Sequence, residues 1–294
     1  MEPTEIEDVI RTVCGQCELT LNLSHRQLTV LPISLSEATS VHRLLLNDNQ
    51  LIMPPSEIIK LTQLQELMLD HNQLTMMPSG IGSLVNLTYL NLSHNNMSIL
   101  PSEIGDLRSL KELWIVALGL VCLPEEITRL KCLVKLGARD NFIETLPCRF
   151  HKLLNLQWLH LGENRLHDLP DSFGRLLKLV YVNLDSNKFA DVPTCLCELP
   201  ALSCLSLRYN AVSSLSDNHI LSFCHLTKLD MRDNPLVSRP NHWKGLDHIL
   251  IGKTGLSEEV TEDIIRACTP HHRWKIHNGV GEEEEEVIED GNSL

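Results

Sequence analysis

Histidines are the first candidates for a metal site in this chain. The chain has 14 of them, and three recur in phase with a 23-residue period: His25, His71 and His94. Imidazole nitrogens bind zinc, but a protein zinc site needs three or four ligands. No carboxylate or cysteine stands where it would complete a site with His71 and His94. We therefore expect these histidines to be surface or contact residues, and we expect no metal and no other cofactor.

Cysteines give the second chemical signal. The ten cysteines are scattered, and only Cys14 and Cys17 are considered as a C-x-x-C pair. One such pair without a second is a weak indication of zinc binding or redox chemistry, and structural thiols are the alternative that we favour. Most of the other cysteines replace a small apolar residue, as reduced thiols do in the cytosol.

Catalytic motifs are not found in the sequence. It contains neither a glycine-rich phosphate-binding loop nor a G-x-S-x-G nucleophile motif. No segment outside the repeats described below is long enough to hold a catalytic domain. We therefore expect a protein that is not an enzyme.

The charge of the chain excludes other classes of partner. The net charge is −13 at pH 7, and the last 14 residues, GEEEEEVIEDGNSL, supply −7 of it. Acidic surfaces repel phosphate backbones and anionic lipids, so nucleic acid is not an expected partner. No stretch reaches about 18 uncharged apolar residues, and the N-terminus has no signal-peptide pattern. We expect no membrane span and a location in the cytoplasm, with the nucleus as the alternative.

The chain is organised by a 23-residue repeat with the pattern L-x-x-L-x-L-x-x-N-x-L, and the strands and turns of this repeat would carry any site. Positions are counted from its third leucine, the anchor. The ten anchors follow this 23-residue period, with a last interval of 24: Leu23, Leu46, Leu69, Leu92, Ile115, Ala138, Leu161, Leu184, Leu207 and Met231. Asn follows each anchor by three residues, except at Arg26 and Leu118. One unit cannot bury its own leucines, so the units must stack around a shared core.

This pattern resembles that of the leucine-rich repeat family. The 23-residue units with L-P-x-x-I-x-x-L-x-x-L are similar to those of intracellular members such as Erbin, Scribble and the Ras suppressor. The resemblance covers residues 19–240. It implies an α/β solenoid, a horseshoe of about ten repeats with a parallel sheet on its concave side. The asparagines are expected to maintain this fold by satisfying buried backbone groups of the turns.

Both ends of such an array need caps, because an open end exposes core leucines. Residues 1–18 are predicted to form an N-terminal helical cap. Residues 241–280 are predicted to form the C-terminal cap, with a helix near 257–268. The acidic residues 281–294 are predicted to be a disordered tail.

Positions −3, −1, +1 and +2 of each repeat are predicted to face the concave surface, where all three tyrosines and two of the four tryptophans fall. Such residues are common interface anchors. Repeat five is apolar there, because Trp114 and Val116 replace polar residues, and Gly137 leaves room for the indole. The alternative is a degenerate repeat tolerated between regular neighbours. We predict one partner across repeats five to nine, contacting Trp114, Val116, Arg139, Trp158, His160, Tyr181, Asp185, Arg208 and Tyr209.

The function that these predictions favour is a non-enzymatic scaffold or adaptor in signalling that binds a protein on the concave face. The resemblance implies a small GTPase or a phosphatase catalytic subunit as the partner. One alternative is a substrate receptor of a ubiquitin ligase, with residues 241–280 recruiting the ligase. Another is an acidic-tailed chaperone or regulator of basic proteins, which salt-sensitive histone binding through residues 282–290 would favour.

Overall fold

The computed structural model describes residues 3–53, 56–236, 243 and 245–254. All of them belong to one compact unit, Met1–Glu259. The helix predicted near 257–268 and the tail predicted at 281–294 lie outside the described residues.

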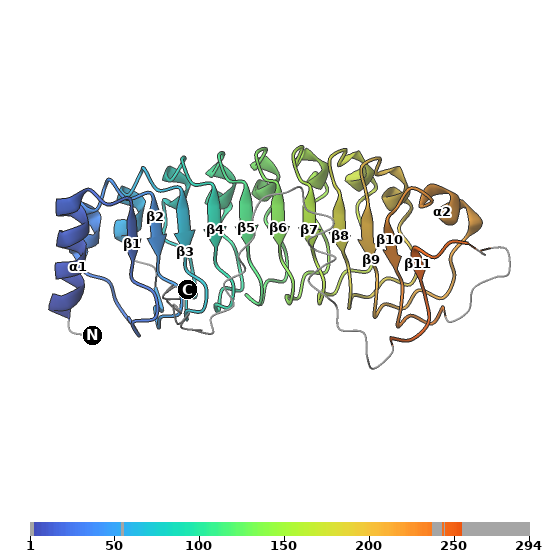
Figure 1. Cartoon of the computed structure of the whole chain (residues 1–294), viewed down its shortest axis with the longest axis horizontal. Coiled ribbons are helices and arrows are strands. Elements are labelled where there is room, and N and C mark those ends of the chain that lie inside the picture. Colours follow the sequence, from blue (N-terminus) through green and yellow to red (C-terminus); the bar gives the residue numbers. More distant parts are fainter. Residues whose placement is uncertain (1–2, 54–55, 237–242, 244, 255–294) are drawn as a thin grey trace, which may run out of the picture. The chain divides into compact units, whose positions relative to one another are not determined.

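A single parallel sheet of 11 strands, in sequence order, runs through this unit (Figure 1). Trp114 pairs with Gly137, and Gly137 with His160, so residues one period apart lie side by side. Each repeat position therefore forms a column across the sheet. The strands are β1 (Thr20–Asn22), β2 (Arg43–Leu45), β3 (Glu66–Met68), β4 (Tyr89–Asn91), β5 (Glu112–Trp114), β6 (Lys135–Gly137), β7 (Trp158–His160), β8 (Tyr181–Asn183), β9 (Cys204–Ser206), β10 (Lys228–Asp230) and β11 (Ile249–Leu250).

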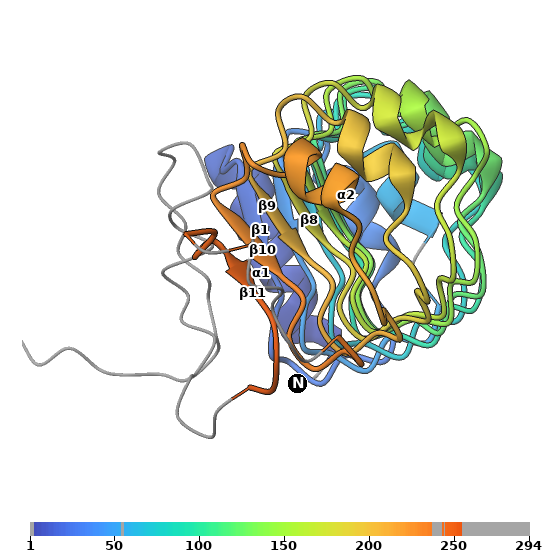
Figure 2. The same cartoon turned by 90° about the vertical axis from the view of Figure 1, so that its right-hand side faces the viewer.

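Short helices form the second layer, and Figure 2 shows them on the opposite side of the core from the sheet. Proline in an extended conformation precedes four of them and ends the preceding segment. Eight are 3-10 helices: η1 (Ile33–Glu37), η2 (Ser56–Lys60), η3 (Ile81–Ser83), η4 (Ser102–Asp106), η5 (Glu125–Arg129), η6 (Phe150–Lys152), η7 (Asp171–Arg175) and η8 (Thr194–Glu198). In repeat nine the layer continues as α2 (Asp217–Ser222), which begins where the Ser216 hydroxyl accepts the His219 N–H.

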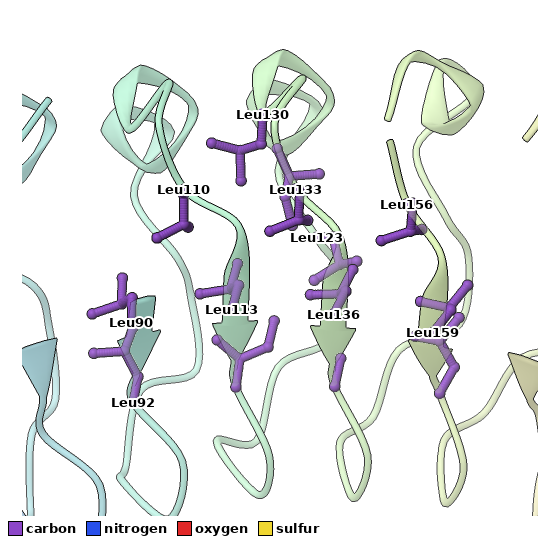
Figure 3. Packing of buried hydrophobic residues seen from close by; sticks show 14 of the residues in the cluster. Leu90, Leu92, Leu110, Leu113, Leu123, Leu130, Leu133, Leu136, Leu156 and Leu159 are labelled. Carbon is purple, nitrogen blue, oxygen red and sulfur yellow. The ribbon is translucent and has the colours of Figure 1, made fainter. Parts of the chain in front are cut away.

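The core is a continuous stack of aliphatic side chains between these layers. Figure 3 shows Leu90, Leu113, Leu136 and Leu159 at the same position of four successive strands. All four are fully buried. The stacking of units thus buries leucines that one unit alone would expose, as the sequence predicts.

Buried asparagines hold the turns that follow the strands. Asn95 Nδ2 donates to Leu69 O at 2.9 Å and to Leu92 O at 2.8 Å, and Asn95 Oδ1 accepts the Leu74 N–H at 2.9 Å. One side chain therefore satisfies backbone groups of two repeats. The same arrangement recurs at Asn49, Asn72, Asn141, Asn164, Asn187, Asn210 and Asn234.

Repeat five has no asparagine at this position, and Asn141 of repeat six accepts the N–H groups of its turn instead. Leu118 occupies the slot and is 2% exposed, so it seals the core without an amide. Its own N–H donates to Asn141 Oδ1 at 3.1 Å, beside the Leu120 N–H at 3.0 Å. Asn141 Oδ1 therefore accepts two N–H groups from the turn of repeat five, and Asn49 Oδ1 does the same for repeat one, where Arg26 replaces the asparagine.

The two ends of the described unit differ from the middle. Helix α1 (Pro3–Gln16) occupies the predicted N-terminal cap and buries Ile6, Ile10 and Val13 in the core. At the other end, the segment predicted as part of a helical cap contributes β11, which pairs with β10 and adds an eleventh strand. In the part of the chain that the structure describes, no helix is long and apolar enough to cross a membrane.

Candidate functional site

The open face of the sheet is its face away from the core, and it carries a row of aromatic rings. We call Trp114, Trp158, His160 and Tyr181 the aromatic cluster. The rings of Trp158 and Tyr181 stack, with centroids 5.4 Å apart and planes 7° apart. Trp158 also contacts Trp114, at a centroid distance of 5.3 Å, and His160, at 5.7 Å. Four of the nine residues predicted to bind a partner therefore form one contact group over strands β5 to β8.

Gly137 makes this group possible. A Cβ atom on Gly137 would stand 2.5 Å from Trp114 Cε3 and 2.8 Å from Cζ3, closer than real atoms approach. The indole of Trp114 thus lies over the strand between its own and that of Trp158. The room that the sequence predicts beside Trp114 is present, and it allows contact across two strands.

Substituting Gly137 tests this geometry. We expect Gly137→Ala to displace the Trp114 indole, change the tryptophan fluorescence and cost about 1–2 kcal/mol of stability. The matched background is Trp114→Ala, in which the added methyl group meets no ring, so the same substitution should cost nothing there. An equal cost in both backgrounds, measured by urea denaturation, would contradict this explanation.

Ion pairs border the aromatic cluster. Arg139 pairs with Glu163, and both side chains are exposed. Lys135 Nζ lies 3.2 Å from Glu112 Oε1, and both side chains are largely buried. This second pair is not among the residues predicted to bind a partner, although opposite charges one period apart in one column could have indicated it. Val116 lies half-buried beside Trp114. The surface around the rings is thus mixed in charge.

Asp185 has a structural role that its position alone did not reveal. Its carboxylate accepts the Ser206 hydroxyl at 2.6 Å, the Arg208 N–H at 2.7 Å and the Asn183 side-chain amide at 3.0 Å. Burial raises the pKa of this carboxyl group above its usual value. The Asp185 carboxylate therefore joins its own repeat to the next one through these hydrogen bonds.

Arg208 differs from the prediction of an exposed side chain. It is only 8% exposed, and its guanidinium donates to Thr254 Oγ1 at 2.7 Å and pairs with Asp233 at 3.3 Å. It also lies 5.1 Å from the centre of the Tyr209 ring, and Tyr209 is 52% exposed. Of this pair, only Tyr209 presents a surface to solvent.

His160 is held neutral by its surroundings. Burial, with Arg139 nearby, lowers its pKa to about 4. Its Nδ1 accepts the Gly162 N–H at 3.3 Å, which requires an unprotonated nitrogen. At neutral pH the ring is therefore an uncharged member of the aromatic cluster.

The histidine column has a conformational explanation. His71 and His94 stack with ring centroids 4.3 Å apart, and burial lowers the pKa of His94. His25, His71 and His94 have φ angles of 57°, 53° and 55°, in the left-handed region where His, Asn and Asp are enriched. Among the described residues, no group of three or more His, Cys, Asp or Glu side chains could hold a metal ion.

Comparisons with known proteins agree with this architecture. Residues 62–116 match a family model described as leucine rich repeat, and residues 155–176 match a second model with that description. A search of curated protein sequences gives no match. Folds of this type generally mediate protein–protein interaction, and most are binding modules without catalytic activity.

Solved structures of other repeat proteins are similar to this chain. A leucine-rich repeat protein of Leptospira interrogans is 28% identical, with a TM-score of 0.62 over 83% of this chain and 74% of that one. A TDR receptor is 26% identical, with a TM-score of 0.62 over 82% of this chain and 48% of that one. A TLR13–ssRNA13 complex is 25% identical, with a TM-score of 0.69 over 84% of this chain and 38% of that one.

This chain spans less than half the length of the two receptor chains. The stacked 23-residue units, the parallel sheet and the two family-model matches show that the chain has the fold of a leucine-rich repeat solenoid.

Proposed function

We propose that this chain is a non-enzymatic adaptor that binds a protein partner on the open face of its sheet, with the aromatic cluster as the anchor. The observation that carries the proposal is the contact group of Trp114, Trp158, His160 and Tyr181. Stacked rings on a sheet present a large rigid contact area at a small cost in conformational entropy.

The ion pairs around the rings support the same function. Interfaces combine an aromatic centre with a polar rim that excludes water and sets orientation. Here Arg139 and Glu163 are exposed at the edge of the aromatic cluster and supply such a rim. Because both signs are present, we expect a partner with a mixed surface around an apolar or aromatic side chain.

A signalling role in the cytoplasm completes the proposal. Small GTPases and phosphatase catalytic subunits are the partners that similarity to intracellular members of the family suggests. Among the described residues Cys204 is disulfide-bonded, and the other eight cysteines are free thiols, Cys14 and Cys17 among them. The eight free thiols are the feature that favours a reducing compartment, and the disulfide at Cys204 is the feature that opposes it.

Capture of partners by wild type and by Trp158→Ala tests the proposal. Trp158 contacts all three other rings, so its truncation removes the centre of the aromatic cluster. We expect a small set of proteins to disappear from the variant's capture list. For the partner so named, affinity should fall at least tenfold, or about 1.4 kcal/mol.

The matched control is Tyr89→Ala. Tyr89 occupies the same column as Trp158 and is also half-buried, but it lies in β4, outside the aromatic cluster. It should leave the captured set unchanged, and melting followed by circular dichroism should show both variants folded. Equal losses for the two variants, or no loss for Trp158→Ala, would refute a site on the aromatic cluster.

A further inference from the structure

A row of basic residues lies at the edge of the array where the chain passes from the short helices to the strands. Figure 3 shows this edge at Leu110, Leu133 and Leu156. In repeats five to eight, the seven Lys and Arg side chains at positions −9 to −4 form what we call the basic edge. They are Arg108, Lys111, Arg129, Lys131, Lys152, Arg175 and Lys178, and all seven are exposed. Asp106 is the one carboxylate at these positions, so they carry a charge of +6 in a chain whose net charge is −13.

Hydrogen bonds between repeats hold the basic edge in register. The Val134 N–H donates to Lys111 O at 2.7 Å, and Asn155 Nδ2 donates to Lys131 O at 2.8 Å. Lys178 Nζ donates to Asn155 Oδ1 at 2.6 Å, which links Lys131, Asn155 and Lys178 across three successive repeats. Neighbouring repeats lie about 5 Å apart at the sheet, so the basic edge extends over roughly 15 Å.

Stacking of the repeats does not require these cations. At positions −9 to −4, the charged residues of repeats two to four are Glu37 and Lys60, and Glu198 is that of repeats nine and ten. The strands of those repeats nevertheless pair in the same register as the strands of repeats five to eight. The basic edge is therefore a local feature of the middle repeats and not part of the pattern that holds the fold.

The cations of the basic edge differ in their pairing from those of the open face. On the open face, all six Lys and Arg side chains at positions −3, −1, +1 and +2 pair with carboxylates. On the basic edge Arg129 is paired, at 3.9 Å from Asp106 and from Glu126. Among the described residues, the other six side chains of the basic edge have no ion pair. Like charges this close repel each other, and a bound anion would remove that repulsion.

Apolar side chains between the cations indicate the kind of anion. Leu154 and Leu177, at position −7 of repeats seven and eight, are 58% and 65% exposed. A phosphate backbone has no apolar group to cover them, and no aromatic residue stands at positions −9 to −4 of these repeats to stack on a base. A protein segment that carries apolar side chains among its carboxylates complements both the leucines and the cations.

Acidic residues limit the breadth of that anion. Glu103, Glu125, Glu126 and Asp171 stand at the start of the short helices of repeats five, six and eight, directly beyond the basic edge. A lipid surface or a nucleic-acid duplex extends past the basic edge and would meet these carboxylates. A single extended peptide would not, and about five of its residues span roughly 15 Å.

We infer that the basic edge binds an acidic segment of a partner protein, with apolar side chains among its carboxylates, in an extended conformation along repeats five to eight. The carboxylates pair with the unpaired Lys and Arg side chains, and the apolar side chains cover Leu154 and Leu177. This binding surface is additional to the aromatic cluster, and the inference does not depend on the function proposed there.

Binding of a labelled acidic peptide to the full chain tests the inference. The probe is a fluorescein-labelled peptide of about ten residues with the repeated sequence Glu-Glu-Leu, and fluorescence anisotropy measures its affinity. We expect wild type to bind it, and binding to weaken as the salt concentration rises from about 50 to about 300 mM. Lys131→Gln combined with Lys178→Gln should weaken binding about tenfold, because two charged contacts to carboxylates are lost.

The matched control is Lys60→Gln combined with Lys188→Gln. Both side chains are exposed and without an ion pair in the part of the chain that the structure describes, and neither belongs to the basic edge. The control removes the same net charge and should leave the affinity unchanged. Thermal melting should show both double variants folded and as stable as wild type, since the substitutions remove exposed charges.

Four outcomes would overturn the inference. Wild type that fails to bind the probe has no such site. Equal losses in the two double variants would mean that the probe responds to the overall charge. Equal affinity for a peptide with Ser in place of Leu would mean that any polyanion suffices. Tighter binding of an oligothymidylate than of the peptide, lost in the Lys131/Lys178 double variant, would make nucleic acid the partner of the basic edge.

Discussion

Replacing Asn141 by alanine is expected to lower the free energy of unfolding by about 3–4 kcal/mol, because several buried backbone groups lose their partner at once. Asn141 Oδ1 accepts the N–H groups of both Leu118 and Leu120. Its Nδ2 donates to Ile115 O at 2.9 Å and to Ala138 O at 3.1 Å. No amide in repeat five can replace it, since Leu118 fills that slot.

Asn164→Ala is the control for this prediction. Asn164 donates to the equivalent carbonyl oxygens, but its Oδ1 accepts only one N–H, that of Ile143 at 3.0 Å. Its replacement should therefore cost about 1 kcal/mol less than that of Asn141. Urea denaturation followed by circular dichroism measures both. Equal losses would show that the second N–H contributes nothing, and that repeat five needs no support from its neighbour.

The regular part of the fold could be predicted because each repeat encodes its own place. Leucines at fixed offsets set the buried face, and identical neighbours set the register, so the pairing of Trp114 with Gly137 follows from the 23-residue period. Strand β11 could not be predicted in this way. Ile249 and Leu250 have no repeat pattern around them, and their strand forms because β10 offers an unpaired edge.

The candidate site was partly predictable for the same reason. The column positions place Trp114, Trp158 and Tyr181 on one face. The contact of Trp114 with Trp158 follows from the missing side chain at Gly137, and that of Trp158 with Tyr181 from the pairing of β7 with β8. The burial of Arg208 was not predictable, because it depends on Thr254, which lies 46 residues later and outside the repeats. The repeat period predicts contacts between neighbouring units. It does not predict contacts with the segment that follows the repeats, which contains Thr254.

Acidification from pH 7.5 to pH 5 is expected to destabilise the fold through His160. Its pKa is about 4 in the folded chain, against about 6.5 for an unperturbed histidine. As the pH falls, the unfolded chain therefore takes up the proton at a higher pH than the folded chain. The free energy of unfolding decreases as a result between pH 6.5 and pH 4. At pH 5 the loss should be at most about 2 kcal/mol.

His160→Gln isolates this effect from the titration of other groups. Glutamine cannot be protonated in this range, so the variant should lose about 2 kcal/mol less than wild type between the two pH values. Urea denaturation of both proteins at both pH values measures the difference. Equal losses would mean that His160 has the same pKa in the folded and unfolded chains, and that the Gly162 N–H bond to Nδ1 is not maintained in solution.

The same proton connects stability with the proposed binding site. His160 contacts Trp158, so a partner seated on the aromatic cluster removes more water from the imidazole and opposes its protonation further. Binding and protonation must then compete, whichever occurs first. For a partner captured through Trp158, affinity should weaken in wild type as the pH falls towards 4, where the free folded chain protonates His160, and stay level in His160→Gln. A partner whose affinity has the same pH dependence in both proteins does not cover His160, and its contact must lie elsewhere on the open face.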